Sequence, residues 1–210
     1  MGKKFFAAAL AVAAMCATVF AAPMTFQVDT AHSNVGFTVP ILGGLSQVSG
    51  KFTDFTAEIV YDEADVTKSS VKAVIKAASV DTGIERRDAH LRNADFFDVE
   101  KFPEITFVSS RVARRGKQLV ATGTFTMRGV SKEIELPFTV NGLRKNPANG
   151  STTLGASARL TLNRRDFGVS FSRPDNPDFL GDMIQIELDL VSRPSGGQQQ
   201  PARPAATPRP

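Results

Sequence analysis

Cysteine and tryptophan are scarce in this chain of 210 amino acids. There is one cysteine, Cys16, and no tryptophan. Cys16 lies in a segment that we expect to be removed, so the mature chain holds no thiol. That excludes disulfides, thiolate catalysis and metal sites with cysteine ligands. The core alone must then hold the fold, and about 150 residues suffice, because they bury roughly 70% of their unfolded surface.

Export is predicted by residues 1–21. Lys3 and Lys4 provide a positive start, residues 5–17 are an apolar run, and small residues precede Ala22. This is the pattern of a secretory signal peptide. A retained membrane anchor is the less favoured alternative, because a transmembrane helix needs about 20 apolar residues. We expect a signal peptide over 1–21 and a mature chain that begins at Ala22.

The formal net charge of +4 does not indicate a nucleic-acid partner. Four cations, Lys3, Lys4, Arg203 and Arg209, lie in the two terminal segments. Subtracting these four from 25 basic residues leaves 21, which equals the 21 acidic residues. The folded part is therefore neutral, and we predict no nucleic-acid binding. Short cationic pairs such as residues 114–115 and 164–165 are interpreted as solvated surface.

The last part of the chain has a different composition from the rest. After Val191 it contains serine, glycine, glutamine, proline and arginine, but no large apolar side chain. Such a segment cannot bury enough surface to fold. We expect one domain over 22–192 and a disordered Pro/Gln-rich tail over 193–210.

Alternation of apolar and polar residues is the main pattern of the domain. Val35, Phe37 and Val39, for example, alternate with small or polar residues. A period of two predicts strands with one wet face. Seven more segments are predicted as strands, one of them with a slip near Asp54: residues 52–59, 71–77, 105–107, 119–127, 134–140, 158–162 and 184–190.

Strands at this spacing predict a sandwich or a barrel. A closed sheet of eight strands removes the exposed edges and leaves room for side chains or one ligand, so the barrel is slightly favoured. Residues 84–94 break the pattern and favour one short helix, which we expect to lie over one barrel end. The predicted fold class is all-β, an antiparallel barrel of about eight strands.

Several separated motifs resemble the YceI-like family of polyisoprenoid-binding proteins. They follow the family order over nearly the whole domain, which makes the signal specific. The motifs are Asp29-Thr30-Ala31-His32-Ser33, Gly50-Lys51-Phe52, Ser79-Val80-Asp81-Thr82, Arg87-Asp88-Ala89-His90-Leu91, Asp95-Phe96-Phe97-Asp98, Phe102-Pro103, Gly129-Val130, Asn163-Arg164, Asp166-Phe167-Gly168 and Gly181-Asp182.

This resemblance implies a lipocalin-like periplasmic barrel whose lumen takes a long-chain lipid: a polyisoprenoid, an isoprenoid quinone or an acyl lipid. It implies no other cofactor. A peripheral or transient membrane contact and a homodimer stay open. The proline-rich segment Val169 to Leu180 is longer than is usual in the family, and this leaves the shape of one pocket mouth undetermined.

The alternation and the resemblance together give a candidate lumen. Its predicted members are Phe37, Val39, Phe52, Phe96, Phe97, Phe107, Phe125, Leu136, Phe138 and Phe167. The alternative for each ring is an ordinary packed core, since buried aromatic residues usually just pack. Alternation tells which side a ring faces, but not whether the space beside it is empty.

Polar residues near the two histidines form the second candidate set. His32, Arg87, Asp88 and His90 are predicted at the pocket mouth, where they would meet a ligand head group. Two histidines and one carboxylate are too few to favour a metal site. A hydrogen-bonded histidine that fixes a helix or strand is the commoner outcome.

Catalysis has little support in the sequence. There is no Gly-x-Ser-x-Gly motif, and His32 and Ser33 would point to opposite faces of a strand, so they cannot act as a pair. We predict a binding protein and no catalytic residues. The rivals are an enzyme that acts on lipids or amides, and a partner-binding module with a filled barrel.

Export gives the first testable prediction. Because signal peptidase should cut before Ala22, N-terminal sequencing of the secreted protein should read Ala-Pro-Met-Thr. An abundant species that still begins with Met1 would contradict export with cleavage.

Overall fold

Three bent strands begin the fold, and each is interrupted by a short irregular segment. The computed structural model describes residues 22–195. The halves of the bent strands are β1 (Met24–Val28) and β2 (Asn34–Ile41), β3 (Ser46–Phe52) and β4 (Phe55–Tyr61), and β5 (Ser70–Lys76) and β6 (Val80–Asp81). The slip expected near Asp54 is the break between β3 and β4.

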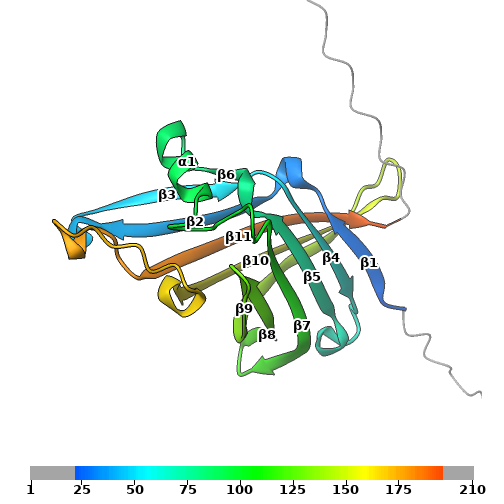
Figure 1. Cartoon of the computed structure of the whole chain (residues 1–210). Coiled ribbons are helices and arrows are strands. Elements are labelled where there is room, and N and C mark those ends of the chain that lie inside the picture. The colour runs from blue at the N-terminus through cyan, green and yellow to red at the C-terminus, as the bar shows by residue number, and fades with distance from the viewer. Residues whose placement is uncertain (1–21, 196–210) are drawn as a thin grey trace, which may run out of the picture.

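Five longer or unbroken strands complete the sheet. They are β7 (Glu104–Arg115), β8 (Gln118–Met127), β9 (Val130–Lys145), β10 (Thr152–Asn163) and β11 (Met183–Pro194). Between β6 and β7 lies α1 (Glu85–Arg92), at the short edge strand β6 (Figure 1). No helix among residues 22–195 is long and apolar enough to cross a membrane.

The sheet closes on itself as a barrel of eight strands. The pairing order β1-β4-β5-β7-β8-β9-β10-β11 is antiparallel throughout, and β11 pairs back with β1. The second halves β2, β3 and β6 continue the same sheet from β11 (Figure 1). The predicted antiparallel barrel with one short helix is confirmed, and the sandwich alternative is wrong.

Two details of the ends differ from the sequence prediction. β1 was not predicted, because Met24–Val28 is too short to show a clear alternation. β11 runs beyond the predicted boundary at Ser192, since Arg193 pairs with Gln27 and Pro194 with Phe26. The predicted signal peptide and the tail from residue 196 onward lie outside the described residues.

Tight turns join the long strands where glycine permits them. Arg128 and Gly129, between β8 and β9, have φ angles of 51° and 73°. Two successive positive φ values are those of a type I′ turn, whose twist matches that of the flanking strands. The register of β8 against β9, which sets which side chains face inward, starts from this turn.

Gly123 lies at a close approach between two strands and gives a stability prediction. A Cβ atom on Gly123 in β8 would lie 2.4 Å from the backbone oxygen of Val108 and 2.7 Å from Cα of Ser109. Backbone cannot move aside cheaply, so Gly123→Ala should destabilise the fold by about 1–3 kcal/mol. Gly155→Ala in β10 is the matched control, because its Cβ would meet only ordinary contacts from 3.5 Å. Chemical denaturation of both variants tests this, and equal stabilities would contradict it.

Candidate functional site

The barrel encloses a cavity of about 450 Å³. Its wall is made by the inward-facing side chains of the strands, because successive residues of a strand point to opposite faces. Nine of the ten residues predicted for the lumen line it: Phe37, Val39, Phe52, Phe96, Phe97, Phe107, Phe125, Leu136 and Phe138.

Phe167 is the predicted lumen residue that does not line the cavity. It is 1% exposed and its ring meets the ring of Phe125 edge to face, 5.2 Å between centroids. The short helical turn η5 (Arg164–Phe167) carries it away from the end of β10. Phe167 therefore supports the wall from behind, and its predicted place in the lumen is corrected.

Strands β10 and β11 supply wall residues that were not among the predicted lumen set. Leu160 and Leu162 face the cavity from β10, and Ile184, Ile186 and Leu188 face it from β11. The same period of two that identified these strands also gives their inward faces. The emphasis on phenylalanine left them out.

The two ends of the cavity differ. Val66, from the turn η3 (Val66–Lys68), and the side chains of Val112 and Leu154 are buried where they line one end, and the exposed Ser70 lines the cavity beside them. At the other end the lining residues Ile41 and Val48 are partly exposed. We call the first the η3 end and the second, which lies beside α1, the open end.

Two polar side chains at the open end come from α1. His90 lines the cavity, and its Nε2 lies 2.9 Å from Oδ2 of Asp95. The edge of the imidazole ring meets Phe96 and Phe171, at 5.0 and 5.1 Å between centroids. Arg87 also lines the cavity, and its Nε donates to Oγ1 of Thr82 at 2.7 Å. Both residues predicted here line the cavity, and their contact with a ligand head group stays a prediction.

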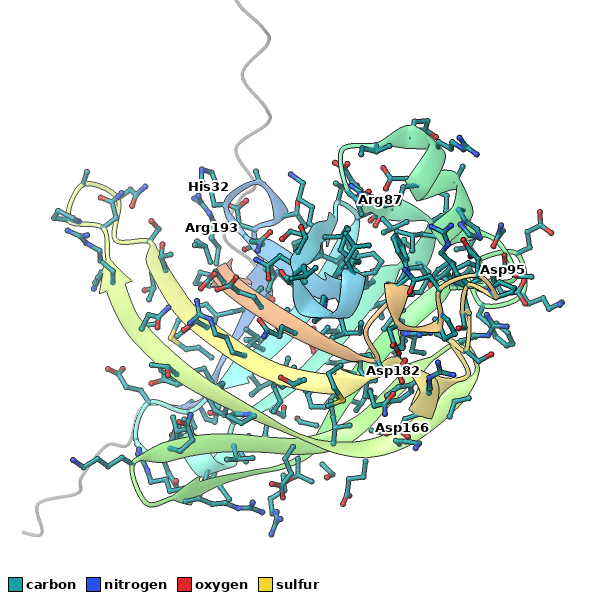
Figure 2. The ribbon with its side chains drawn as sticks, turned by 90° about the vertical axis from the view of Figure 1, so that its left-hand side faces the viewer. His32, Arg87, Asp95, Asp166, Asp182 and Arg193 are labelled. Atoms are coloured by element: carbon teal, nitrogen blue, oxygen red, sulfur yellow. The ribbon has the colours of Figure 1, made fainter. Side chains whose placement is uncertain are left out.

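Asp88 and His32 lie elsewhere. Asp88 is buried and accepts a hydrogen bond from the backbone nitrogen of Thr82 at 2.9 Å, so it fixes the start of α1. His32 has a side chain that is 65% exposed, and its Nδ1 is 3.0 Å from Oδ2 of Asp29. Figure 2 shows His32 beside Arg193 and away from Arg87. Neither lines the cavity, which corrects their predicted place at its mouth.

Asp29 is the acceptor that holds His32 and Arg193 together. Arg193 Nε donates to its Oδ2 at 3.0 Å. Burial raises the pKa of this carboxyl, but the hydrogen bonds from His32 and Arg193 lower it by more, so the pKa lies below its ordinary value. The cluster is a structural clamp between the β1–β2 junction and β11. Among residues 22–195, no group of three or more histidine, aspartate or glutamate side chains is placed to hold a metal ion.

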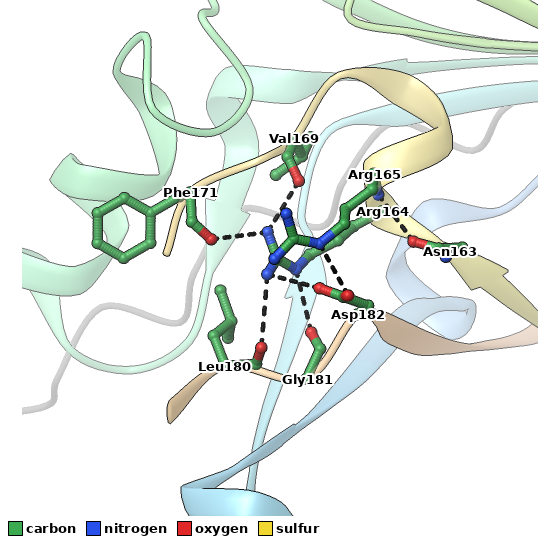
Figure 3. A network of polar contacts seen from close by, with 8 residues as sticks. All are labelled: Asn163, Arg164, Arg165, Val169, Phe171, Leu180, Gly181 and Asp182. Carbon is green, nitrogen blue, oxygen red and sulfur yellow. Dashed lines mark hydrogen bonds and ion pairs between the residues drawn. The ribbon is translucent and has the colours of Figure 1, made fainter. Parts of the chain in front are cut away.

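Arg164 is the buried cation of the site. It is 4% exposed and lines the open end. Its guanidinium donates to the backbone oxygens of Val169 at 2.8 Å, Phe171 at 2.9 Å and Gly181 at 3.0 Å, and Nη2 lies 2.7 Å from Oδ1 of Asp182 (Figure 3). These contacts tie both arms of the 168–182 loop to the end of β10.

The interpretation of residues 164–165 as a solvated pair is wrong for Arg164. Burial lowers its pKa, and the charge of Asp182 works against that shift. Arg165 is exposed and pairs with the same carboxylate from outside, 2.7 Å between Nε and Oδ2. No sequence pattern distinguishes the two, because which of two adjacent arginines faces inward depends on the turn η5.

The fold and the site define a closed antiparallel barrel with an apolar internal cavity. The YceI-like domain matches residues 26–192, and the chain belongs to this family. A UPF0312 protein of Shewanella sp. strain ANA-3 is 33% identical over 192 residues, which cover 90% of this chain and 96% of that one.

Two solved structures have the same fold. Burkholderia cenocepacia BcnA is 28% identical, with a TM-score of 0.68 over 78% of this chain and 98% of that one. A polyisoprenoid binding domain from Saccharophagus degradans, implicated in plant cell wall breakdown, is 14% identical, with a TM-score of 0.61 over 82% of this chain and 99% of that one. At that identity the second likeness concerns the fold alone.

Arg164 gives the prediction of this site. Arg164→Met should lower the free energy of unfolding by roughly 3 kcal/mol or more, because it leaves several buried carbonyl oxygens without donors. Arg165→Met removes the exposed partner of the same carboxylate and should cost less than about 1 kcal/mol. Thermal or chemical unfolding of the pair tests this. Similar losses in both variants would show that burial does not distinguish them.

Proposed function

We propose that the protein binds a long-chain apolar lipid in its cavity and carries or sequesters it in the periplasm. The cavity itself is the observation that carries this proposal. Protein interiors normally pack with few voids larger than a water molecule. A space of about 450 Å³ is instead within the range of small-molecule pockets, about 300–1,000 Å³. This argues against the rival filled-barrel module.

The chemistry of the wall favours an aliphatic chain over a polar ligand. Side chains such as Phe107, Leu136 and Ile186 line its middle, while the polar lining residues Arg87, His90 and Arg164 lie at the open end. Each methylene group moved from water into such a wall contributes about 0.8 kcal/mol. A chain of many carbons can therefore bind tightly without specific polar contacts, after the cost of ordering it.

The apolar wall and the family both support a ligand with a long apolar chain. A polyisoprenoid, an isoprenoid quinone or an acyl lipid all present a long apolar chain with a small head group. The Saccharophagus domain of this fold is described as polyisoprenoid binding, which supports the first two. The periplasmic location rests on the signal pattern of residues 1–21, and the expected process is binding without turnover.

Solvent extraction followed by mass spectrometry tests whether the protein holds a lipid. We expect the purified protein to release an isoprenoid or acyl lipid, and the stripped protein to gain thermal stability on addition of solanesol, a long prenyl alcohol. Stabilisation is expected because a ligand that binds only the folded state shifts the unfolding equilibrium. Neither a released lipid nor a stabilising probe would contradict the proposal.

A variant that fills the cavity locates the binding site. Ala158 lines the cavity from β10, so Ala158→Phe should put a ring into existing space and abolish solanesol binding. The fold should survive, because the ring occupies a void instead of displacing packed atoms. Thr161→Phe, on the outer face of the same strand, is the matched control and should bind normally. Binding that survives in folded Ala158→Phe would place the ligand elsewhere.

A further inference from the structure

The tip of the β2–β3 hairpin exposes two leucines. Leu45 is 90% exposed and Leu42 is 44% exposed, and among residues 22–195 no other large apolar side chain is as exposed as Leu45. Residues 35–50, which include this tip, contain no charged side chain. Single exposed apolar residues are ordinary, but two together on an uncharged projection form a small apolar surface.

The backbone at this tip does not require leucine. Leu42, Gly43 and Gly44 have φ angles of 55°, 64° and 90°. This left-handed region favours glycine or asparagine, and a leucine there costs free energy. The turn would form more easily with asparagine at position 42. Strain of this kind points to a role for the side chain itself.

The leucine tip adjoins the open end of the cavity. Ile41, directly before it, and Val48, shortly after it, line the cavity. Ile41 also bridges to Leu180, and the backbone nitrogen of Gly181 donates to the oxygen of Pro40 at 2.8 Å. The hairpin tip and the 168–182 loop thus lie side by side, at the left-hand end of the molecule in Figure 1.

We propose that Leu42 and Leu45 dock the open end of the barrel onto a lipid bilayer, so that an apolar chain passes between membrane and cavity without crossing water. This proposal rests on the proposed function, because docking serves lipid transfer only if the cavity takes up a lipid. The occupant is a bilayer because the apolar tip is continuous with the mouth of a cavity suited to a membrane lipid. Nearby charges do not favour anionic lipid, because Arg173 pairs with Asp175 at 2.7 Å and the acidic side chain of Asp178, in the turn η6 (Pro177–Phe179) that contacts the tip, is exposed.

Binding to vesicles without any isoprenoid tests the docking surface alone. The mature protein, without residues 1–21, should co-sediment with phosphatidylcholine vesicles, and the double variant Leu42→Asn/Leu45→Ser should bind roughly tenfold more weakly. Asparagine suits the backbone at position 42, so the fold is not threatened. Val108→Ser, which removes a 46% exposed apolar side chain from the outer wall, is the matched control and should bind as the unchanged chain does.

Transfer of ligand tests the purpose of the docking. Solanesol should move from phosphatidylcholine vesicles to the stripped protein at least roughly tenfold more slowly in the double variant. Loading of the same variant from detergent micelles at equilibrium should be unchanged, because the cavity is intact. If neither the unchanged chain nor the double variant takes up solanesol from micelles, the proposed function fails. Co-sedimentation with vesicles that contain no isoprenoid still tests the docking by itself.

Three outcomes would overturn the docking proposal. If the double variant and the unchanged chain bind vesicles equally well, the two leucines do not contribute to docking. Binding that needs anionic lipid and is lost in salt would point to surface charge instead. A dimer in solution that dissociates in the double variant, without vesicle binding by either, would show that the tip packs against a second copy of the chain.

Discussion

Closure of the sheet between β1 and β11 is the constraint on which the cavity depends. Only three residue pairs join the two strands, from Phe26 with Pro194 to Val28 with Ser192. A clamp at the β1–β2 junction extends this short ladder. The backbone nitrogen of Asp29 donates to the oxygen of Val191 at 2.8 Å, and the hydroxyl of Ser33 accepts from the nitrogen of Val191 at 2.9 Å. The polar residues around His32 therefore act on the fold, and the apolar interior depends on them indirectly.

The bends in the first three strands make the two ends of the barrel different. At each bend the chain leaves one pairing and enters another, so β1, β4 and β5 close the ring at one end, while β2, β3 and β6 continue the sheet from β11 at the other and leave β6 as an edge strand. Leu91 and Phe97, in and after α1, pack against the core beside this part of the sheet. Strands without these bends would pair in the same order at both ends, and the two ends would not differ in this way.

Period-two alternation predicted the strands and the seven strand residues of the lumen set that line the cavity, because inward and outward faces are properties of each strand alone. Phe96 and Phe97 lie in a turn, and only the family resemblance indicated them. Contacts between segments that are distant in the sequence could not be predicted from alternation. Phe167 looked like a wall residue, yet η5 turns it behind Phe125; Arg164 looked like a surface charge, yet the returning 168–182 loop buries it. Whether space is left inside the barrel also depends on the strand count and on all side chains at once, which no local pattern contains.

The polar and apolar side chains at the open end are arranged in a way that is consistent with lipid exchange. Arg164 donates hydrogen bonds to backbone oxygens of the 168–182 loop. Its guanidinium is therefore hydrogen-bonded within the protein, and an apolar chain can pass it without leaving this polar group unsatisfied. Outside the rim, the hairpin tip presents Leu42 and Leu45 instead of charges. A chain entering between them meets the hydrogen-bonded Arg164 and the apolar side chains of the cavity in turn. The loop that Arg164 holds is thus the part of the fold where stability and ligand entry are most closely linked.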